Sequence, residues 1–216
     1  MSDKLVVNEI FYSIDGEGRR AGCASVFVRL AGCNLRCNYC DTGYALSFKD
    51  GTEMDVSEII TEIEKYSCKN ITITGGEPLI HNECKTLIKS LWEKGYDVVV
   101  ETNGSVSIMD VAQYASICMD WKMPSSGMCN EMVEDNLGIL WKMDVLKAVV
   151  RASDLPYLRF FLDKHSLKCP VYISPVYGEI QLPEIAEFIK EYHGDNILRM
   201  QLQMHKFIWN PNERGV

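Results

Sequence analysis

The chain has 216 residues, of which 47% are hydrophobic and 24% are charged. This length and composition predict one hydrophobic core, and we expect a single domain over residues 1–216. Thirty acidic against 22 basic residues give a net charge of −8, which argues against a broad binding surface for nucleic acid or an anionic membrane. The N-terminus has no apolar signal core and no run reaches transmembrane length, so we expect a cytoplasmic protein without disulfides.

Apolar and β-branched runs predict strands, in chain order, at residues 5–12, 25–31, 70–74, 96–101, 116–121, 146–151, 170–176 and 197–203. Amphipathic patterns predict helices over residues 55–66, 82–95 and 182–192. The second helix should bury Leu87, Ile88, Leu91 and Trp92 and end at Gly95. Strands that alternate with helices indicate a parallel sheet covered by helices. About six such units are too few for a closed eight-stranded barrel, so we predict an α/β fold with a partial, open (β/α)6-type barrel of mostly parallel strands.

Polar, glycine-rich loops follow five of these strands, and we expect them to meet at one rim of the barrel. Each of them alone would be typical of a simple turn, but five on one rim indicate a functional site. They are "AGCNLRCNYCDTGYA" (31–45), "TGGEPL" (74–79), "ETNGS" (101–105), "DWKMPSSG" (120–127) and "SPVYGE" (174–179).

The first of these loops holds Cys33, Cys37 and Cys40 in a C-x3-C-x2-C spacing. Short spacings of thiolates let one loop wrap a soft metal centre, but a structural zinc site usually has four protein ligands. An iron–sulfur cluster with three cysteine ligands leaves one iron open to a small molecule. The other cysteines have no pairing motif and are more often small buried hydrophobes than ligands; they are Cys23, Cys68, Cys84, Cys118, Cys129 and Cys169.

The cysteine loop, with Tyr39 before its last cysteine, resembles the signature of radical S-adenosylmethionine (SAM) enzymes. "GGEP" (75–78) after the next strand resembles the second motif of that superfamily. The resemblance implies a trimmed radical SAM core and a 4Fe–4S cluster on Cys33, Cys37 and Cys40. SAM would bind the open iron through its amino and carboxylate groups, and the backbone and glutamate of GGEP would hold the methionine amino group.

Four longer stretches of the sequence narrow the resemblance from the superfamily to one family within it. "IFYSIDGEGRRAG" (10–22), "FVRLAGCNLRCNYCDTGYA" (27–45), "DWKMPSSG" (120–127) and "LQMHKFIWNPNERGV" (202–216) together resemble the 7-carboxy-7-deazaguanine synthase family. That family converts 6-carboxy-5,6,7,8-tetrahydropterin to 7-carboxy-7-deazaguanine with loss of ammonia, on the route to queuosine and related 7-deazapurines. The resemblance therefore implies a carbon–nitrogen lyase with a small pterin substrate. It also implies a magnesium ion, an electron donor such as flavodoxin or ferredoxin, and a homodimer.

The same resemblance implies roles for individual residues. Thr42 would bind magnesium. The residues implied to contact SAM are Tyr39, Cys40, Asp41, Gly76, Asp120, Trp121, Lys122, Ser174, Pro175, Val176 and Tyr177. The residues implied to contact the substrate are Ile14, Asp15, Gly16, Glu17, Arg29, Thr74, His205 and Val216.

The chemistry of these residue types leaves some alternatives open. Arg29 lies in an apolar strand and needs an anion, which is either the substrate carboxylate or an internal carboxylate. Glu17 suits a guanidine-like pterin edge, or it belongs to a solvated turn. His205 by itself is typical of a structural histidine. Two positions depart from the family: Asp15 where glutamine is frequent, and Val216 where some relatives have proline.

Two other functions remain open at this point. A glycyl-radical activating enzyme has the same cysteine spacing but acts on a protein partner, and it would need neither "SIDGEG" nor the C-terminal motif. A non-enzymatic iron–sulfur electron carrier would need none of the loops that follow the cysteine motif.

Overall fold

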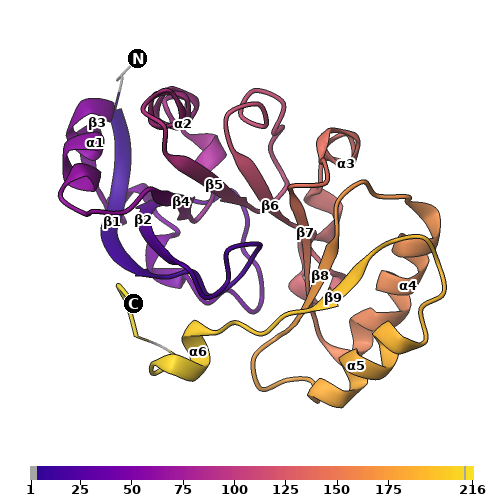
Figure 1. The fold of residues 1–216 in the computed structure, drawn as a ribbon. Helices are drawn as coiled ribbons and strands as arrows, with labels where there is room; N and C mark the ends of the chain where they lie inside the picture. Colours follow the sequence, from indigo (N-terminus) through magenta and orange to yellow (C-terminus); the bar gives the residue numbers. More distant parts are fainter. Residues whose placement is uncertain (1–3, 212) are drawn as a thin grey trace.

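The computed structural model describes residues 4–211 and 213–216. Its strands form one sheet in the order β3-β1-β2-β4-β5-β6-β7-β8-β9. From β2 to β9 all neighbours are parallel, whereas β1 pairs antiparallel with both β2 and β3. The sheet curves but does not close (Figure 1), which confirms the predicted partial, open barrel. The strands are β1 Lys4–Ile14, β2 Ala24–Leu30, β3 Thr52–Asp55, β4 Asn70–Gly75, β5 Asp97–Thr102, β6 Ser116–Asp120, β7 Val145–Val150, β8 Val171–Pro175 and β9 Leu198–Met200.

The predicted helices are present, and two of them end or begin as their sequences indicate. In α1, the Asp55 backbone N–H donates to the Glu58 carboxylate at 2.7 Å, as in a capping box. After α2, Gly95 has φ +77°, the left-handed conformation of a helix C-cap. The helices are α1 Val56–Glu64, α2 Cys84–Glu93, α3 Asn136–Ile139, α4 Leu155–Lys164, α5 Leu182–Lys190 and α6 His205–Ile208.

Several sequence predictions about the elements were wrong or incomplete, and the short helices α3 and α6 were not predicted. The Trp92 side chain is 50% exposed and packs against the Tyr114 ring, with 5.5 Å between the ring centres. Helix α2 therefore buries Leu87, Ile88 and Leu91 but not Trp92. Strand β3 was missed because its sequence, TEMD, shows no apolar alternation and lies at the sheet edge. Helix α4 was missed as well, although it buries one apolar stripe against the sheet.

The strands have two different faces, because successive side chains point to opposite sides of a sheet. One set of strand side chains forms the core with α1, α2, α4 and α5; it includes Val28, Ile73, Val100, Leu146 and Ala148. These helices cover the outer side of the curved sheet (Figure 1). The residues between them in sequence point to the inner side, and they include Arg29, Thr74, Glu101 and Lys147. The inner face therefore carries charged and polar side chains beside a small apolar cluster of Val99, Cys118, Val145 and Tyr172, although its strands read as apolar runs.

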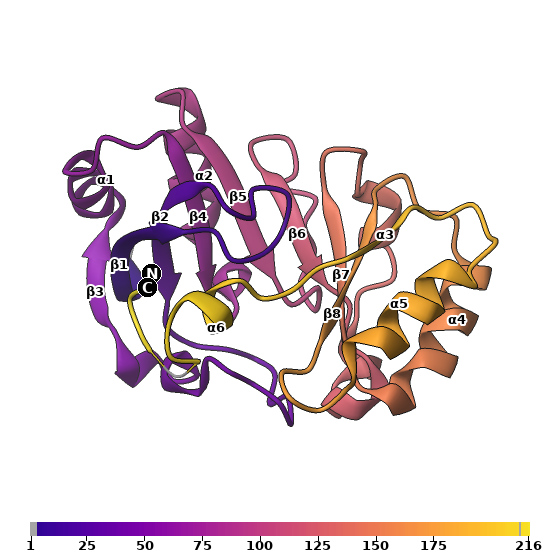
Figure 2. The ribbon, with the colours of Figure 1, turned by 60° about the horizontal axis from the view of Figure 1, so that its bottom comes forward.

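The C-terminal segment returns from β9 to the β1–β2 edge of the sheet, as Figures 1 and 2 both show. The Gln201 amide holds both backbone groups of Gly18, accepting from its N–H at 2.7 Å and donating to its carbonyl at 2.9 Å. The Met204 N–H donates to the Gly16 carbonyl at 3.0 Å. These bonds bring the start of α6 beside the turn that follows β1. No helix in the described part of the chain is long and apolar enough to cross a membrane.

Candidate active site

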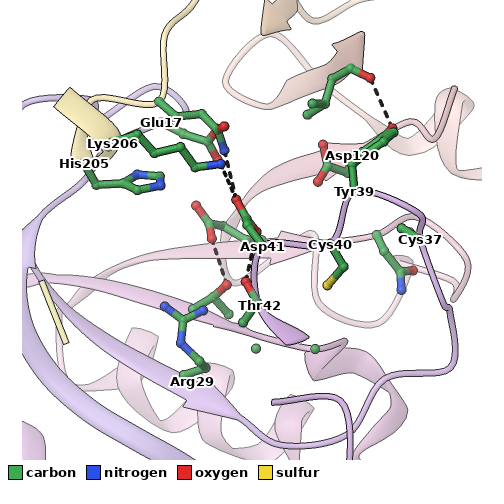
Figure 3. A pocket seen from close by; sticks show the side chains of 18 of the residues that line it. Glu17, Arg29, Cys37, Tyr39, Cys40, Asp41, Thr42, Asp120, His205 and Lys206 are labelled. Atoms are coloured by element: carbon green, nitrogen blue, oxygen red, sulfur yellow. Dashed lines mark hydrogen bonds and ion pairs between the residues drawn. The ribbon is translucent and has the colours of Figure 1, made fainter. Parts of the chain in front are cut away.

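A cavity of about 430 Å³ lies on the inner face of the sheet, at the carboxyl ends of the parallel strands. The volume is in the range of small-molecule sites. Figure 3 shows Cys37, Cys40 and Tyr39 on one side of it and Arg29, His205 and Lys206 on the other. The predicted site residues that line it are Ile14, Gly16, Glu17, Arg29, Cys33, Cys37, Tyr39, Cys40, Asp41, Thr42, Thr74, Gly76, Asp120, Lys122, Val176, Tyr177, His205 and Val216.

Four of the predicted residues do not line this cavity: Asp15, Trp121, Ser174 and Pro175. The Trp121 ring packs on Phe161 at 4.9 Å and borders a smaller cavity beside α4. Ser174 is fully buried in β8, and its hydroxyl has no hydrogen-bond partner among the described residues. Pro175 is also buried, at the end of β8.

Asp15 is buried and paired with other side chains inside the protein. Its carboxylate accepts from the Ser25 hydroxyl at 2.5 Å and from the Thr72 hydroxyl at 3.1 Å, and it lies 3.2 Å from Arg20 Nε. Burial raises the pKa of Asp15, while these three partners oppose that shift. The carboxylate that replaces the amide of the family is thus matched by a buried arginine. Its visible role is to fix the turn that presents Gly16 and Glu17.

The cysteine loop is held in place by its backbone. Cys40 N–H donates to the Cys37 carbonyl at 3.2 Å, and Asn38 N–H donates to the Ser126 carbonyl at 3.0 Å. Tyr39 reaches back to β7, where its hydroxyl donates to the Val149 carbonyl at 3.2 Å. Burial raises the pKa of Cys37 and of Cys40, so both are thiols when they carry no metal.

Within the described residues, no three His, Cys, Asp or Glu side chains are grouped as ligands of one metal ion. Three cysteines that each bind a different iron of one cluster are spaced more widely than the ligands of a single ion. Cys33, Cys37 and Cys40 all line the cavity from one loop, and thiolates are the ligands that an iron–sulfur cluster takes. Of the other cysteines, Cys84, Cys118 and Cys169 are buried as predicted, whereas Cys23 is exposed and Cys68 and Cys129 are half-buried.

The GGEP loop packs directly against the cysteine loop. A Cβ on Gly76 would lie 2.3 Å from the Gly32 carbonyl oxygen and 2.7 Å from Cys33 Cβ, so only glycine permits this approach. Glu77 turns inward and does not line the cavity. It accepts from Leu79 N–H, Thr102 Oγ1 and Asn103 N–H at 3.0, 2.8 and 2.6 Å.

Glu77 is fully buried, and burial raises its pKa to about 7. Two of its three hydrogen bonds, from Thr102 and Asn103, connect the loop after β4 to the end of β5 and the loop that follows it. Its role in the structure is to hold two adjoining loops of the rim together.

Four charged side chains form a continuous network across the cavity. Lys147 Nζ lies 2.7 Å from Glu17 Oε2 and 3.4 Å from Asp120 Oδ2, and Lys122 Nζ lies 3.0 Å from the same Asp120 oxygen. Burial alone would lower the pKa of Lys147, but Asp120 and Glu17 outweigh it and raise that pKa well above its ordinary value. Burial acts to raise the pKa of Asp120, yet Lys122 and Lys147 hold it below the ordinary value. Asp120, Lys122 and Lys147 are therefore charged at neutral pH.

Arg29 has an internal partner. Its Nε donates to Glu9 Oε1 at 2.7 Å, and Tyr44 donates to the same oxygen at 3.3 Å. The guanidinium also lies 5.7 Å from the ring centres of Phe11 and Tyr44. Among the described residues, Nε is the Arg29 nitrogen that pairs with a carboxylate. The two terminal nitrogens face the cavity that Arg29 lines (Figure 3). The internal ion pair and a ligand contact are thus compatible.

Asp41 and Thr42 lie at the end of the cysteine loop, beside α6. Lys206 Nζ lies 2.8 Å from Asp41 Oδ2, and the Thr42 hydroxyl donates to Asp41 Oδ1 at 3.1 Å. Burial acts to raise the pKa of Asp41, but Lys206 dominates and lowers it strongly. His205 packs against Gly16, where an added Cβ would be 2.4 Å from Nδ1, and burial lowers its pKa. His205 is therefore neutral at pH 7.

Several polar residues that were not predicted also line or border the cavity, among them Glu9, Tyr44, Glu101, Lys147 and Lys206. Glu101 accepts from Thr74 at 2.8 Å, and burial raises its pKa to about 7. The pattern that drew attention to Arg29, a charge within an apolar strand, also occurs in "VVVET" and "LKAVV". It could have identified Glu101 and Lys147 as residues of the inner face.

Comparisons with known proteins agree with this geometry. The profile of the Radical SAM superfamily matches residues 27–120. The chain is 43% identical to the 7-carboxy-7-deazaguanine synthase of Clostridium acetobutylicum over the full length of both. It is 40% identical to that of Methanospirillum hungatei, over 97% of this chain and 88% of the relative. The crystal structure of QueE from Escherichia coli matches with a TM-score of 0.73 at 21% identity, over 93% of this chain and 95% of that one, and thus supports the fold. This chain belongs to the 7-carboxy-7-deazaguanine synthase family of radical SAM enzymes.

Proposed function

We propose that this chain converts 6-carboxy-5,6,7,8-tetrahydropterin to 7-carboxy-7-deazaguanine with loss of ammonia. One observation carries the proposal: a single cavity has a three-cysteine loop at one end and Glu17, Arg29 and His205 at the other. A radical enzyme for a small substrate needs this proximity, because the reacting atoms must be held together away from water. A protein substrate, as for a glycyl-radical activating enzyme, would need an open groove instead. The family membership argues against that alternative and against a simple electron carrier.

The residues at the cysteine end fit the cofactors that family membership implies, a 4Fe–4S cluster and SAM. Cys33, Cys37 and Cys40 would hold the cluster, and the glycines of GGEP leave space beside it. Asp120 Oδ1 is buried and has no hydrogen-bond partner among the described residues, so it can accept from a hydroxyl or amino group of SAM. When bound, cluster and SAM supply the one-electron chemistry that removes a hydrogen atom from the substrate.

The other residues predicted for SAM would form a strip along the cavity wall. Tyr39, Asp41, Gly76, Lys122, Val176 and Tyr177 line that wall. Trp121 and Pro175 would act through the backbone, because each adjoins a lining residue in sequence. Ser174 would act in the same way from one residue earlier in β8. The Val176 N–H, for example, donates to the Val150 carbonyl at 2.9 Å, which fixes the loop after β8.

At the opposite end the side chains suit a carboxylated pterin. Glu17 Oε1 is a buried acceptor without a partner in the described residues, which favours a guanidine-like edge of the substrate. The terminal nitrogens of Arg29 match a carboxylate, since a guanidinium presents paired donors. Neutral His205 would donate or accept one further hydrogen bond. Ile14, Gly16, Thr74 and Val216 complete this end of the cavity.

We also propose a magnesium ion at Thr42. Its hydroxyl oxygen is a hard ligand at the junction of the two halves, and waters and substrate oxygens would complete the shell. The ion would neutralise charge on the substrate carboxylate during ring contraction. Asp41 is held by Lys206, so it would orient the Thr42 hydroxyl.

Three further assignments are part of the proposal. Cys40 and Arg36 are exposed at the cysteine loop, which supports electron delivery there by a small carrier such as flavodoxin or ferredoxin. A homodimer would cover some of the exposed apolar side chains, such as Phe207 and Ile208 on α6. All nine cysteines are unpaired, which supports a reducing, cytoplasmic location.

The test is product formation. Protein reconstituted anaerobically with iron and sulfide is mixed with SAM, a reductant, magnesium and 6-carboxytetrahydropterin. The expected result is 7-carboxy-7-deazaguanine and ammonia in equal amounts, detected by mass spectrometry and an ammonia assay. Cluster-loaded protein that cleaves SAM but leaves the pterin unchanged would overturn the proposal and favour a protein substrate.

A further inference from the structure

Lys147 lies between two carboxylates that belong to different halves of the cavity. Its side chain is only 10% exposed, and its Nζ lies 2.7 Å from Glu17 Oε2 and 3.4 Å from Asp120 Oδ2. Glu17 belongs to the turn proposed for the pterin, and Asp120 belongs to the wall proposed for SAM. No other side chain in the described residues is in ion-pair distance of both.

The position of Lys147 follows from the sheet. Asp120 and Lys147 are register partners on the parallel strands β6 and β7, so their side chains emerge next to each other on the inner face. Glu17 comes from the turn after β1, at the far edge of the sheet. It is held near by the bonds between Gln201 and Gly18. The contact therefore joins elements that are more than 100 residues apart.

Each carboxylate uses one oxygen for lysine and keeps the other for the cavity. Glu17 Oε1 and Asp120 Oδ1 are both buried, and neither has a hydrogen-bond partner in the described residues. Buried acceptors without a donor are costly to a fold, so their retention points to ligand donors. Lys147 thus determines which oxygen of each carboxylate is free.

The charges explain why a cation is needed at this position. Glu17, Asp120 and Glu101 all line the same part of the cavity, and like charges at short range repel strongly where water is excluded. Lys122 pairs with Asp120 but not with Glu17. Without Lys147, the Glu17 carboxylate would have no ion-pair partner among the described residues and would no longer be held in this orientation.

We propose that Lys147 is a positioning residue that couples the binding of pterin and SAM, an inference that rests on the function proposed above. A ligand that fixes Asp120 also fixes Lys147, and through it the Glu17 carboxylate that the second ligand needs. Each ligand therefore prepares the site of the other. By thermodynamic linkage the two must enhance each other's affinity by the same factor.

The test measures four dissociation constants by calorimetry on anaerobically reconstituted protein: SAM with and without pterin, and pterin with and without SAM. In the wild type we expect each ligand to tighten the other by about tenfold. In Lys147→Met each ligand alone should bind about tenfold more weakly, and the coupling factor should fall to about one. Lys147→Arg keeps the charge and should recover part of the coupling.

Lys142→Met is the matched control. It removes an equal charge from an exposed position that does not line the cavity. Its affinity for each ligand and its coupling factor should remain those of the wild type. Cluster absorbance and circular dichroism show whether each variant is folded and loaded.

Glu17→Gln keeps the inference testable if Lys147→Met does not fold. Lys147 then still pairs with Asp120, so SAM alone should bind as in the wild type, while pterin affinity and coupling fall. Wild-type coupling in either variant overturns the role of Lys147 and leaves the proposed function intact. A loaded wild type that binds SAM but no pterin overturns both.

Discussion

Arg29 Nε donates to Glu9 Oε1 at 2.7 Å across the antiparallel pair β1–β2, where the two residues are register partners. The ion pair is mostly buried, with side-chain exposures of 15% and 18%. It holds the guanidinium in one orientation, and the terminal nitrogens face the cavity. An arginine preorganised in this way loses little entropy when it binds a carboxylate.

Arg29→Ala should weaken pterin binding by about 2–5 kcal/mol, because it removes a desolvated charged contact. Arg29→Lys should recover little, since an ammonium cannot reproduce two parallel hydrogen bonds. Titration of the pterin into cluster-loaded protein gives the affinities. SAM binding, measured in parallel, should remain unchanged. Equal pterin affinity in Arg29→Ala and wild type would remove Arg29 from the substrate site.

Cys33→Ala, Cys37→Ala and Cys40→Ala should each abolish cluster-dependent cleavage of SAM, because each removes one of three iron ligands. Cys68→Ala and Cys169→Ala are the controls, since neither residue lines the cavity. They should keep the cluster content of the wild type, measured as iron, sulfide and visible absorbance. If a fourth cysteine proved equally necessary for cluster assembly, the hypothesis that one iron is left open to SAM would be wrong.

Thr42→Ala should lower activity and weaken its dependence on magnesium, because one hard oxygen ligand is lost. Thr42→Ser keeps the oxygen and should resemble the wild type. Cluster content should be equal in all three proteins. The measurement is a magnesium titration of the initial rate, and superimposable curves for wild type and Thr42→Ala would exclude Thr42 as a ligand.

Glu101→Gln should change the pH dependence of stability. Burial raises the pKa of Glu101 from 4.5 to about 7 in the folded state. The folded protein therefore binds more protons than the unfolded one between these values, and its free energy of unfolding falls as pH rises through that window. The glutamine variant does not titrate and so lacks this loss. The free energy of unfolding of Glu101→Gln, relative to that of the wild type, should therefore rise by on the order of 3 kcal/mol between pH 4.5 and pH 8.

Chemical denaturation of cluster-loaded protein across that pH range measures the difference. Glu131 is exposed, so the free energy of unfolding of Glu131→Gln should depend on pH in the same way as that of the wild type. A constant difference between Glu101→Gln and the wild type at all pH values would show that burial does not shift the titration of Glu101.

Gly76→Ala should disrupt the cluster site. Its Cβ would lie 2.3 Å from the Gly32 carbonyl oxygen and 2.7 Å from Cys33 Cβ, and a backbone atom cannot move aside as a flexible side chain can. We expect a loss of bound iron together with a lower melting temperature. Gly138→Ala is the control, because nothing lies within 4 Å of its added Cβ. Full iron content in Gly76→Ala would mean that the two loops can separate without loss of the cluster.

Local patterns in the sequence determined the chemistry of this protein. Cys33, Cys37 and Cys40 lie within eight residues, so their spacing alone places the three side chains on one loop. The alternation of strands and helices predicted a parallel sheet. Because the loops that follow parallel strands meet at the carboxyl ends of those strands, the GGEP loop was expected beside the cysteine loop. The start of α1 at Asp55 and the end of α2 at Gly95 could also be predicted, because helix caps depend on a few neighbouring residues.

The tertiary structure decided which charges meet. Glu9 pairs with Arg29 and Lys147 with Glu17 only because sheet register and the returning C-terminal segment bring distant residues together. The same is true of Asp15, which resembles a substrate ligand in sequence but is held by Arg20 inside the fold. Trp92 continues an apolar pattern, yet the core ends before it. Sequence spacing specifies what a segment can bind, whereas the partner of a buried charge depends on strand order, side-chain direction and the depth of the core.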